Sequence, residues 1–120
     1  MANKPDEILS SIKKLIGFDD EYDAFDLDLL THINSAFFTL HQLGVGKTGF
    51  VADENSKWNE FYDEGENLQA IRTYIYYKVR LAFDPPQSSY GIQAFERYCE
   101  QLEWRLNVEV ETEALDNANS

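Results

Sequence analysis

The run of residues most suggestive of chemistry is GVGKTG at positions 44–49, which contains the GKT of a phosphate-binding loop. That motif requires a glycine five residues before the GKT glycine, where this chain has His41. It also requires a buried strand in front and a helix behind, whereas a helical pattern precedes the run and a loop with Phe50 and Asp53 follows it. We therefore interpret the run as a helix C-terminal cap and a flexible turn, and we expect no nucleotide to bind there.

A second candidate for chemistry is the acidic run DDEYDAFDLD at residues 19–28, whose six carboxylates suggest calcium binding. A twelve-residue calcium loop that begins at Asp19 needs glycine at its sixth position and glutamate at its twelfth. Ala24 and Leu30 occupy those two positions. The run is therefore predicted to be a solvated linker whose last carboxylates favour the dipole of the following helix.

The side chains of His32, His41 and Cys99 are the remaining candidates for metal binding or nucleophilic catalysis. The two histidines lie nine residues apart, so they do not share one helix face as an i, i+4 metal pair does. Cys99 lies on the apolar stripe of a predicted helix, which favours core packing. The sequence predicts no catalytic residue, no cofactor and no metal site, and we do not expect an enzyme.

Apolar residues at helical spacing predict the elements that carry these side chains. The strongest pattern covers residues 66–83, where two neighbouring apolar stripes indicate a central helix with neighbours on more than one side. Pro85 and Pro86 end it, because proline cannot continue a helix. On the helix that follows the acidic run, the predicted buried side carries Leu27, Leu30, Ile33, Phe37, Phe38 and Leu40. Helices are expected at residues 5–16, 26–43, 55–62 and 66–83, and from Ser88 or Ser89 to about Asn107.

Glycines mark the ends of the first two predicted helices, at Gly17 and Gly44. Residues 44–52 carry three glycines and predict an irregular loop. After Asn107 the chain loses apolar periodicity, which indicates a mobile tail or a segment that orders only on a partner. The predicted fold class is all-α, a small bundle of about four to five helices with a glycine-rich loop and a polar C-terminal tail. We assign residues 1–107 to one helical domain and residues 108–120 to an acidic mobile tail.

The formal net charge of −12, from 22 acidic and 10 basic residues, argues against ordinary binding to nucleic acid, which needs Lys and Arg to displace counterions from phosphates. Anionic membrane surfaces are disfavoured for the same reason. The N-terminal residues lack the apolar segment of a signal peptide, and no apolar stretch approaches the ~20 residues of a membrane span. The single cysteine excludes an internal disulfide and fits a reducing compartment. A soluble, intracellular protein is expected.

Aromatic residues are abundant, with eight Phe, seven Tyr and two Trp in the chain. Such residues are enriched at contacts between protein chains. The second apolar stripe at 66–83 could contact a neighbouring chain, and the glycine-rich loop can take backbone conformations closed to other residues. The candidate interface residues are Tyr74, Tyr77, Leu81, Gly44, Gly46, Phe50 and Trp104.

Three stretches, INSAFFTLHQLGVG (33–46), TYIYYKVRLAFDPP (73–86) and ERYCEQLEWRLNV (96–108), resemble in order and spacing the small neck proteins encoded in the head-morphogenesis region of tailed phages. Those proteins belong with the head–tail connector (adaptor) family, and the likeness covers roughly residues 7–108. The resemblance implies that the domain at 1–107 is connector-like, forms a ring beneath the portal and bridges the DNA-filled head to the tail. It implies no cofactor and no catalytic residue.

The partners implied by this resemblance are the portal protein and a tail-completion or stopper protein. The assembled state would be a homo-oligomeric ring in the virion neck, and the isolated subunit, in the host cytoplasm before assembly, could be a monomer. A ring subunit needs two different faces, each matching the other's partner. Surplus negative charge around a channel would let DNA pass without adhering. The alternative, from another class, is an acidic helical regulatory protein that binds a basic host protein or mimics DNA.

Overall fold

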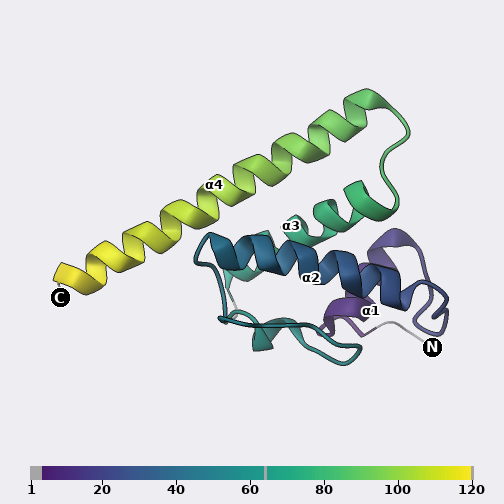
Figure 1. Ribbon diagram of the computed structural model, residues 1–120, viewed down its shortest axis with the longest axis horizontal. Helices are drawn as coiled ribbons and strands as arrows, with labels where there is room; N and C mark the ends of the chain where they lie inside the picture. Colours follow the sequence, from purple (N-terminus) through teal and green to yellow (C-terminus); the bar gives the residue numbers. More distant parts are fainter. Residues whose placement is uncertain (1–3, 64, 120) are drawn as a thin grey trace.

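The computed structural model describes residues 4–63 and 65–119 and has an all-α fold (Figure 1). Residues 1–3 and 64, from the predicted domain, and residue 120, from the predicted tail, lie outside the described residues. The prediction of a small helical bundle is confirmed. The elements are α1 (Ile8–Ile16), α2 (Asp26–Gln42), the 3₁₀ helix η1 (Trp58–Glu60), α3 (Glu66–Phe83) and α4 (Ser89–Asn119).

Helix α1 begins at Ile8 rather than at residue 5, so its predicted start is wrong. The preceding residues are held in a turn and in an antiparallel bridge between Glu7 and Lys57, which takes them out of the helix. Gly17 ends α1 as predicted. Its φ of 112° lies in the left-handed region, and its N–H donates to carbonyl oxygens of the last turn, as glycine C-caps do.

The loop between α2 and α3 is irregular, as predicted, over residues 44–52. Gly44 follows the end of α2 with a φ of +80°, which suits a glycine. Asn34 of α2 fixes the far end of the loop, because its side-chain amide donates to Ala52 O at 3.0 Å and its Oδ1 accepts from Ala52 N at 2.7 Å. The helix predicted at 55–62 is shortened to the single turn η1.

Helix α4 is much longer than predicted. Ser88 caps its start, as expected, since the Ser88 Oγ accepts a hydrogen bond from Gly91 N at 3.0 Å. The prediction that this helix ends near Asn107 is wrong, because it continues to Asn119. Extending an existing helix avoids the cost of nucleation, and the Glu, Ala and Leu of this segment are good helix formers even without an apolar stripe. The mobility of residues 108–120 stays a prediction.

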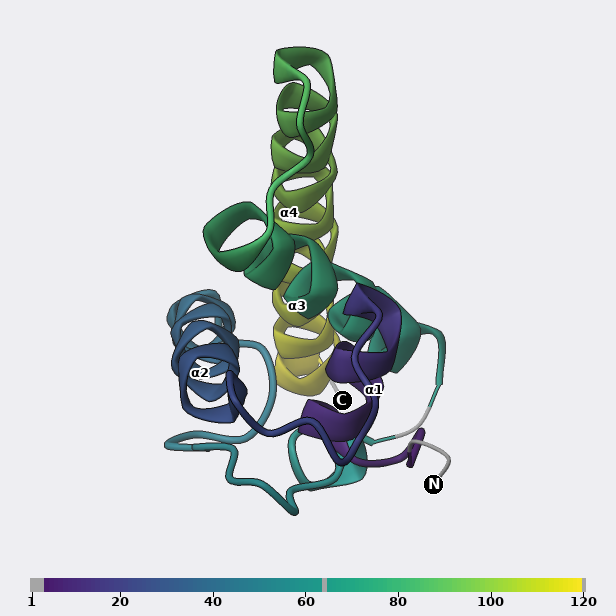
Figure 2. The same cartoon turned by 90° about the vertical axis from the view of Figure 1, so that its right-hand side faces the viewer.

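Helix α3 lies at the centre of the fold and contacts α1, α2 and α4 (Figure 2). The predicted central position of this helix is thereby confirmed. Helix α4 crosses the other helices as a long rod whose C-terminal part extends beyond them (Figure 1). Its 31 residues span roughly 46 Å at ~1.5 Å per residue, which accounts for most of the 50 Å longest dimension of the molecule.

The core forms where α1, α2, η1 and α3 meet, and α4 adds two buried side chains to it. On α2 the buried face differs from the predicted one: Leu27 is 79% exposed and Phe38 is 60% exposed, so their predicted burial is wrong. Helix α3 covers only one side of α2, and both residues lie outside that side. The buried apolar residues are Ile8, Leu9, Ile12, Leu29, Ile33, Ala36, Phe37, Leu40, Val45, Ala52, Trp58, Phe61, Leu68, Ile71, Tyr74, Ile75, Val79, Cys99 and Leu106.

Candidate functional site

Two hollows of contrasting character lie against α4. The first, here called the aromatic groove, has a volume of about 730 Å³ and runs between α3 and α4. The second, the loop cleft, has a volume of about 930 Å³ and lies between the glycine-rich loop, the residues around η1 and the C-terminal half of α4. The aromatic groove is lined by Thr73, Tyr77, Tyr98, Glu100, Gln101, Leu102, Trp104 and Arg105.

The aromatic groove is built on a stack of rings that joins α3 to α4. Tyr77 of α3 stacks on Tyr98 of α4 with ring centroids 5.5 Å apart and an interplanar angle of 10°, and it also meets Phe95 at 4.6 Å. Burial raises the pKa of the Tyr77 hydroxyl, so this ring stays neutral at physiological pH. On the solvent side, Tyr98 is 50% exposed and Trp104 is 69% exposed. Large exposed aromatic side chains beside a groove are typical of a protein–protein contact.

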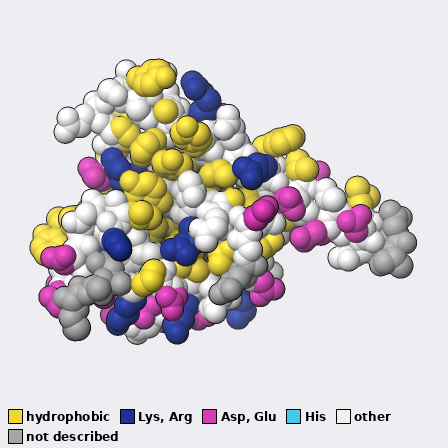
Figure 3. Space-filling view, turned by 180° about the vertical axis from the view of Figure 1, so that it is seen from behind, with side chains coloured by type: hydrophobic (Ala, Val, Ile, Leu, Met, Phe, Trp, Pro, Cys, Tyr) yellow, Lys and Arg dark blue, Asp and Glu magenta, His cyan; other side chains and the backbone are white. Residues whose placement is uncertain are grey.

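The charge around the aromatic groove differs from that of the whole chain. Residues 66–107 hold five of the ten basic residues and five acidic ones, so this region is neutral while the rest of the chain carries the entire net charge of −12. Figure 3 shows the molecule from behind, with hydrophobic side chains gathered over the middle of this view and Lys and Arg side chains among and around them. The groove itself is lined by one carboxylate, Glu100, and one guanidinium, Arg105, so it is apolar and carries no net charge.

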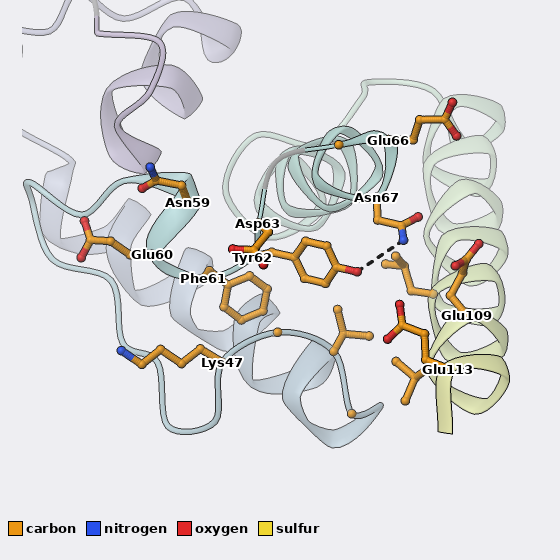
Figure 4. Close-up of a pocket in the computed structure, with 16 residues that line it drawn as sticks. Lys47, Asn59, Glu60, Phe61, Tyr62, Asp63, Glu66, Asn67, Glu109 and Glu113 are labelled. Carbon is orange, nitrogen blue, oxygen red and sulfur yellow. Dashed lines mark hydrogen bonds between the residues drawn. The ribbon is translucent and has the colours of Figure 1, made fainter. Parts of the chain in front are cut away.

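The loop cleft, by contrast, is lined largely by polar side chains (Figure 4). Tyr62 lies across its middle, and the Tyr62 hydroxyl oxygen accepts a hydrogen bond from Asn67 Nδ2 at 3.3 Å. Lys47 points away from α4, while Glu109 and Glu113 rise from α4 on the other side. The carboxylates that line it are Glu60, Asp63, Glu66, Glu109 and Glu113.

Two glycines of the loop are held in place by close packing. A Cβ on Gly46 would collide with the ring of Phe61, and Lys47 N donates to Phe61 O at 3.0 Å. A Cβ on Gly44 would lie 3.2 Å from Cγ1 of Val110, which belongs to the predicted tail. Gly44 and Gly46 therefore allow two neighbouring side chains to approach the backbone, in addition to adopting positive φ.

The geometry of the GVGKTG run does not match a phosphate site. Such sites lie at the N-terminus of a helix, where N–H groups and the positive end of the dipole face the anion. Here the run follows the C-terminus of α2, which presents the negative end of the dipole.

The acidic run at 19–28 is partly engaged by a buried lysine from α1. Lys13 is 1% exposed, and its Nζ lies 2.9 Å from Asp26 Oδ1 and donates to Asp20 O at 2.8 Å. Among the described residues, no three His, Cys, Asp or Glu side chains gather as a metal ion would require.

The predicted interface residues lie in several different parts of the structure. Tyr77 and Trp104 share the aromatic groove, and Gly44 and Gly46 share the loop cleft. Phe50 is half-buried against Phe37 and Phe61, and Leu81 lines a smaller hollow between α2 and α3. Tyr74 has no exposed surface, so it has none to offer a partner in this structure.

Tyr74 and Cys99 both belong to the α3–α4 contact. The Tyr74 hydroxyl donates to Glu103 Oε2 at 2.8 Å, and burial together with this carboxylate raises the pKa of Tyr74. Burial also raises the pKa of the Cys99 thiol to about 11. Cys99 is therefore protonated at neutral pH, and its predicted core packing is confirmed by its burial.

Several residues of the two hollows were missed from the sequence. Tyr98 and Arg105 fall seven positions apart on α4 and so share one face, and this spacing was a signal that could have found them. Glu109, Val110 and Glu113 line the loop cleft from a segment that had been assigned to the tail. No signal in the sequence separated them from the rest of that segment.

Comparison with known proteins gives one family match: the family model described as Phage connector protein matches residues 8–113. This range contains all the residues that line the aromatic groove and the loop cleft. A search of curated proteins and a search of solved structures found no match. None of the described helices combines the length and the apolar composition needed to cross a membrane.

Proposed function

The chain belongs to the phage connector protein family, and on that premise we propose that its subunits form a ring on the portal and join the head to the tail so that DNA can pass. Family membership itself gives a structural role as a phage head–tail connector, at the neck of the virion. The ring, the contacts with the portal and with a tail-completion or stopper protein, and a stage in the host cytoplasm before assembly belong to the proposal.

The observation that carries the proposal is the aromatic groove. Trp104 is 69% exposed and Tyr98 is 50% exposed beside a hollow of about 730 Å³, and the exposed parts of these rings do not stabilise an isolated subunit. Contact with another chain would remove both rings from water, at about 25 cal/mol per Å² of apolar surface. Trp and Tyr are also the residues that most often dominate binding energy at the centre of an interface.

The charge distribution supports passage of DNA past the assembled protein. Outside residues 66–107 the chain carries a net charge of −12, in the acidic segment 19–28, around the loop cleft and in residues 108–120. A surface of this sign offers no cations to displace counterions from phosphates, so DNA would pass without adhering. The neutral surface around the aromatic groove suits a contact with protein.

The experiment is reconstitution with purified portal protein, followed by size-exclusion chromatography with light scattering. Wild-type protein is expected to co-elute with the portal as an assembled ring, and Trp104→Ala to weaken co-elution by about tenfold or more, because truncation of an interface aromatic weakens an assembly that depends on the groove. Phe38→Ala is the matched control, because it removes an exposed aromatic from α2, outside the groove. If wild-type protein binds neither portal nor tail components, the regulatory protein that binds a basic host protein takes the place of this proposal.

A further inference from the structure

The chain carries a second exposed aromatic surface, which is strongly acidic, in the segment 19–28 between α1 and α2 and at the start of α2. Tyr22 is 47% exposed, Phe25 is 37% exposed and Leu27 is 79% exposed. The segment holds six acidic residues and no basic one. It thus combines apolar side chains with negative charge, whereas the aromatic groove combines apolar side chains with exposed arginines.

The acidic segment is presented as a preformed surface. Phe25 packs on Phe18 at 5.9 Å and on Phe83 at 5.3 Å, so the end of α3 supports the segment from beneath. Lys13 holds the backbone of the segment through Asp20 O and the first turn of α2 through Asp26. A surface already fixed in this way loses little conformational entropy when it binds.

The aromatic groove offers matching chemistry. Arg105 lines it, and Arg97 lies one helical turn before Gln101 on the same helix; both arginines are exposed. Glu100 also lines the groove, and Glu96 lies one helical turn before it, so the two arginines are single positive groups on a surface without net charge. The groove lies near the middle of α3, at Thr73 and Tyr77, while the acidic segment packs on Phe83 at the C-terminal end of that helix. The two surfaces lie at different places along α3, so one copy presents both at once.

We propose that the acidic segment 19–28 of one copy docks in the aromatic groove of a second copy. This inference rests on the proposed function and names the contact between neighbouring subunits. The contact joins two different surfaces, so it is head-to-tail and can close into a ring. The apolar side chains of the segment enter the groove, and its carboxylates approach Arg97 and Arg105.

The acidic segment fits the groove better than the other acidic segment of the chain does. Residues 108–120 hold four acidic residues and no basic one, but the large apolar side chains that they expose in the described part are aliphatic, Val108 at 37% and Leu115 at 65%, and none is aromatic. Val110 is half-buried and lies at Gly44. Segment 19–28 offers three large apolar side chains over a short stretch, as an apolar groove requires.

The test uses two variants, each of which keeps one of the two surfaces. The groove variant carries Tyr98→Ala and Trp104→Ala, and the segment variant carries Tyr22→Ala and Leu27→Ala. In sedimentation velocity over a range of concentrations, wild-type protein is expected to self-associate beyond dimers, and each variant alone to stay monomeric. An equimolar mixture is expected to stop at a dimer, because only one intact groove meets one intact segment.

A charge exchange keeps the inference testable if an alanine variant is poorly folded by circular dichroism. Arg97→Glu with Arg105→Glu, and separately Asp23→Lys with Asp28→Lys, should each weaken self-association by about tenfold or more. All four changes in one chain should restore most of it. The control pair Glu54→Lys and Glu111→Lys makes the same change in net charge as the Asp23 and Asp28 pair, at exposed sites outside both surfaces, and should leave self-association within about threefold of wild type.

The docking of the segment in the groove is overturned if the mixture of the two alanine variants stays monomeric. It is also overturned if the variant with all four charge substitutions does not recover self-association. Binding of wild-type protein to the portal is measured in parallel. If the portal binds while the mixture stays monomeric, this inference fails and the proposed function stands. If the mixture forms dimers but no portal or tail component binds, the self-contact stands and the proposed function fails.

Discussion

The α2–α3 interface and the aromatic groove are both built on apolar stripes of α3, and the first is fully covered within the chain whereas the second is covered only in part. Ile75 and Val79 have no exposed surface where α3 meets the core, while Trp104 and Tyr98 stand well exposed where α4 meets α3. Both regions are apolar, the first mainly aliphatic and the second mainly aromatic, and they differ in burial. One side of α3 therefore stabilises the subunit, and the other is available to a neighbouring chain.

The largest expected effect tests this difference directly. Ile75→Ala should lower the free energy of unfolding by ~2–5 kcal/mol, because it removes buried methyl groups and leaves a cavity. Trp104→Ala should change it by less than ~0.5 kcal/mol, as surface substitutions do. Lys47→Ala, in the loop, is expected to fall in the same small range. Denaturant melts of the three variants measure these effects, and equal losses for Ile75→Ala and Trp104→Ala would remove the distinction between the two regions.

A second prediction concerns the loop cleft and uses two glycines with almost the same backbone. Gly46 has a φ of +79° and Gly49 a φ of +74°, so alanine at either position costs ~1–2 kcal/mol in the left-handed region. Only at Gly46 would the new Cβ meet Phe61 as well, whereas nothing lies within 4 Å of a Cβ on Gly49. Gly46→Ala should therefore cost a further ~1–3 kcal/mol from overpacking.

Thermal melts of the two glycine variants measure that difference. Similar losses would show that the loop moves away from Phe61 at little cost. The adaptability predicted for the glycine-rich loop would then extend to Gly46, and would not be confined to Gly49.

The third prediction concerns the hydroxyl of Tyr74, which ties α3 to α4. Tyr74→Phe should lower stability by about 1–2 kcal/mol at neutral pH, because Glu103 loses a hydrogen bond in a buried contact. The pKa of Tyr74 is raised in the folded state above its ordinary value of 10.0. Its contribution is therefore complete below pH 10.0 and is lost as the pH rises above that value, since the unfolded chain then releases the proton first.

Urea melts on either side of pH 10.0 test this dependence in wild-type protein and in Tyr74→Phe. The wild type should lose stability with rising pH more steeply than the variant. Cys99 adds a loss of its own between its ordinary pKa of 9.0 and about 11, and Cys99→Ala is the control that isolates it. Parallel pH curves for wild type and Tyr74→Phe would contradict the assignment.

Much of the fold was predictable because local signals agree with the tertiary structure. Helix α3 was predicted at residues 66–83 because a long apolar pattern ends at two prolines. Gly17 marked a helix end and Ser88 a helix start, and in the structure Gly17 is a left-handed C-cap and Ser88 Oγ caps the N-terminus of α4. The missed start of α1 reflects a tertiary contact, the bridge from Glu7 to Lys57, which no local pattern encodes.

The candidate site was less predictable, because spacing shows which residues share a face and not which face a neighbour covers. Tyr74 and Tyr77 lie three positions apart on α3, yet one is fully buried and the other lines the groove. Leu27 and Phe38 fit the apolar pattern of α2 and are exposed all the same. The path of α4 across α3 decides the burial of the two tyrosines, and that path is a property of the whole fold.

The smallest expected effect concerns the segment that the sequence assigned to a tail. Val110 packs on Gly44, and Glu109 and Glu113 line the loop cleft, so removal of residues 109–120 should cost about 1 kcal/mol from lost burial of a half-exposed valine. Removal of residues 114–120 should cost less than ~0.5 kcal/mol, since their described side chains are exposed. Thermal melts followed by circular dichroism compare the two truncations.

If neither truncation lowers stability, α4 stabilises the subunit only up to Leu106 and Asn107. Residue 107 is then a correct boundary between the stable domain and the tail, even though the helix runs through it. If only the longer truncation is destabilising, that boundary lies beyond Val110, and the part of the chain left to act as an adaptable segment on a partner is shorter than the sequence predicted.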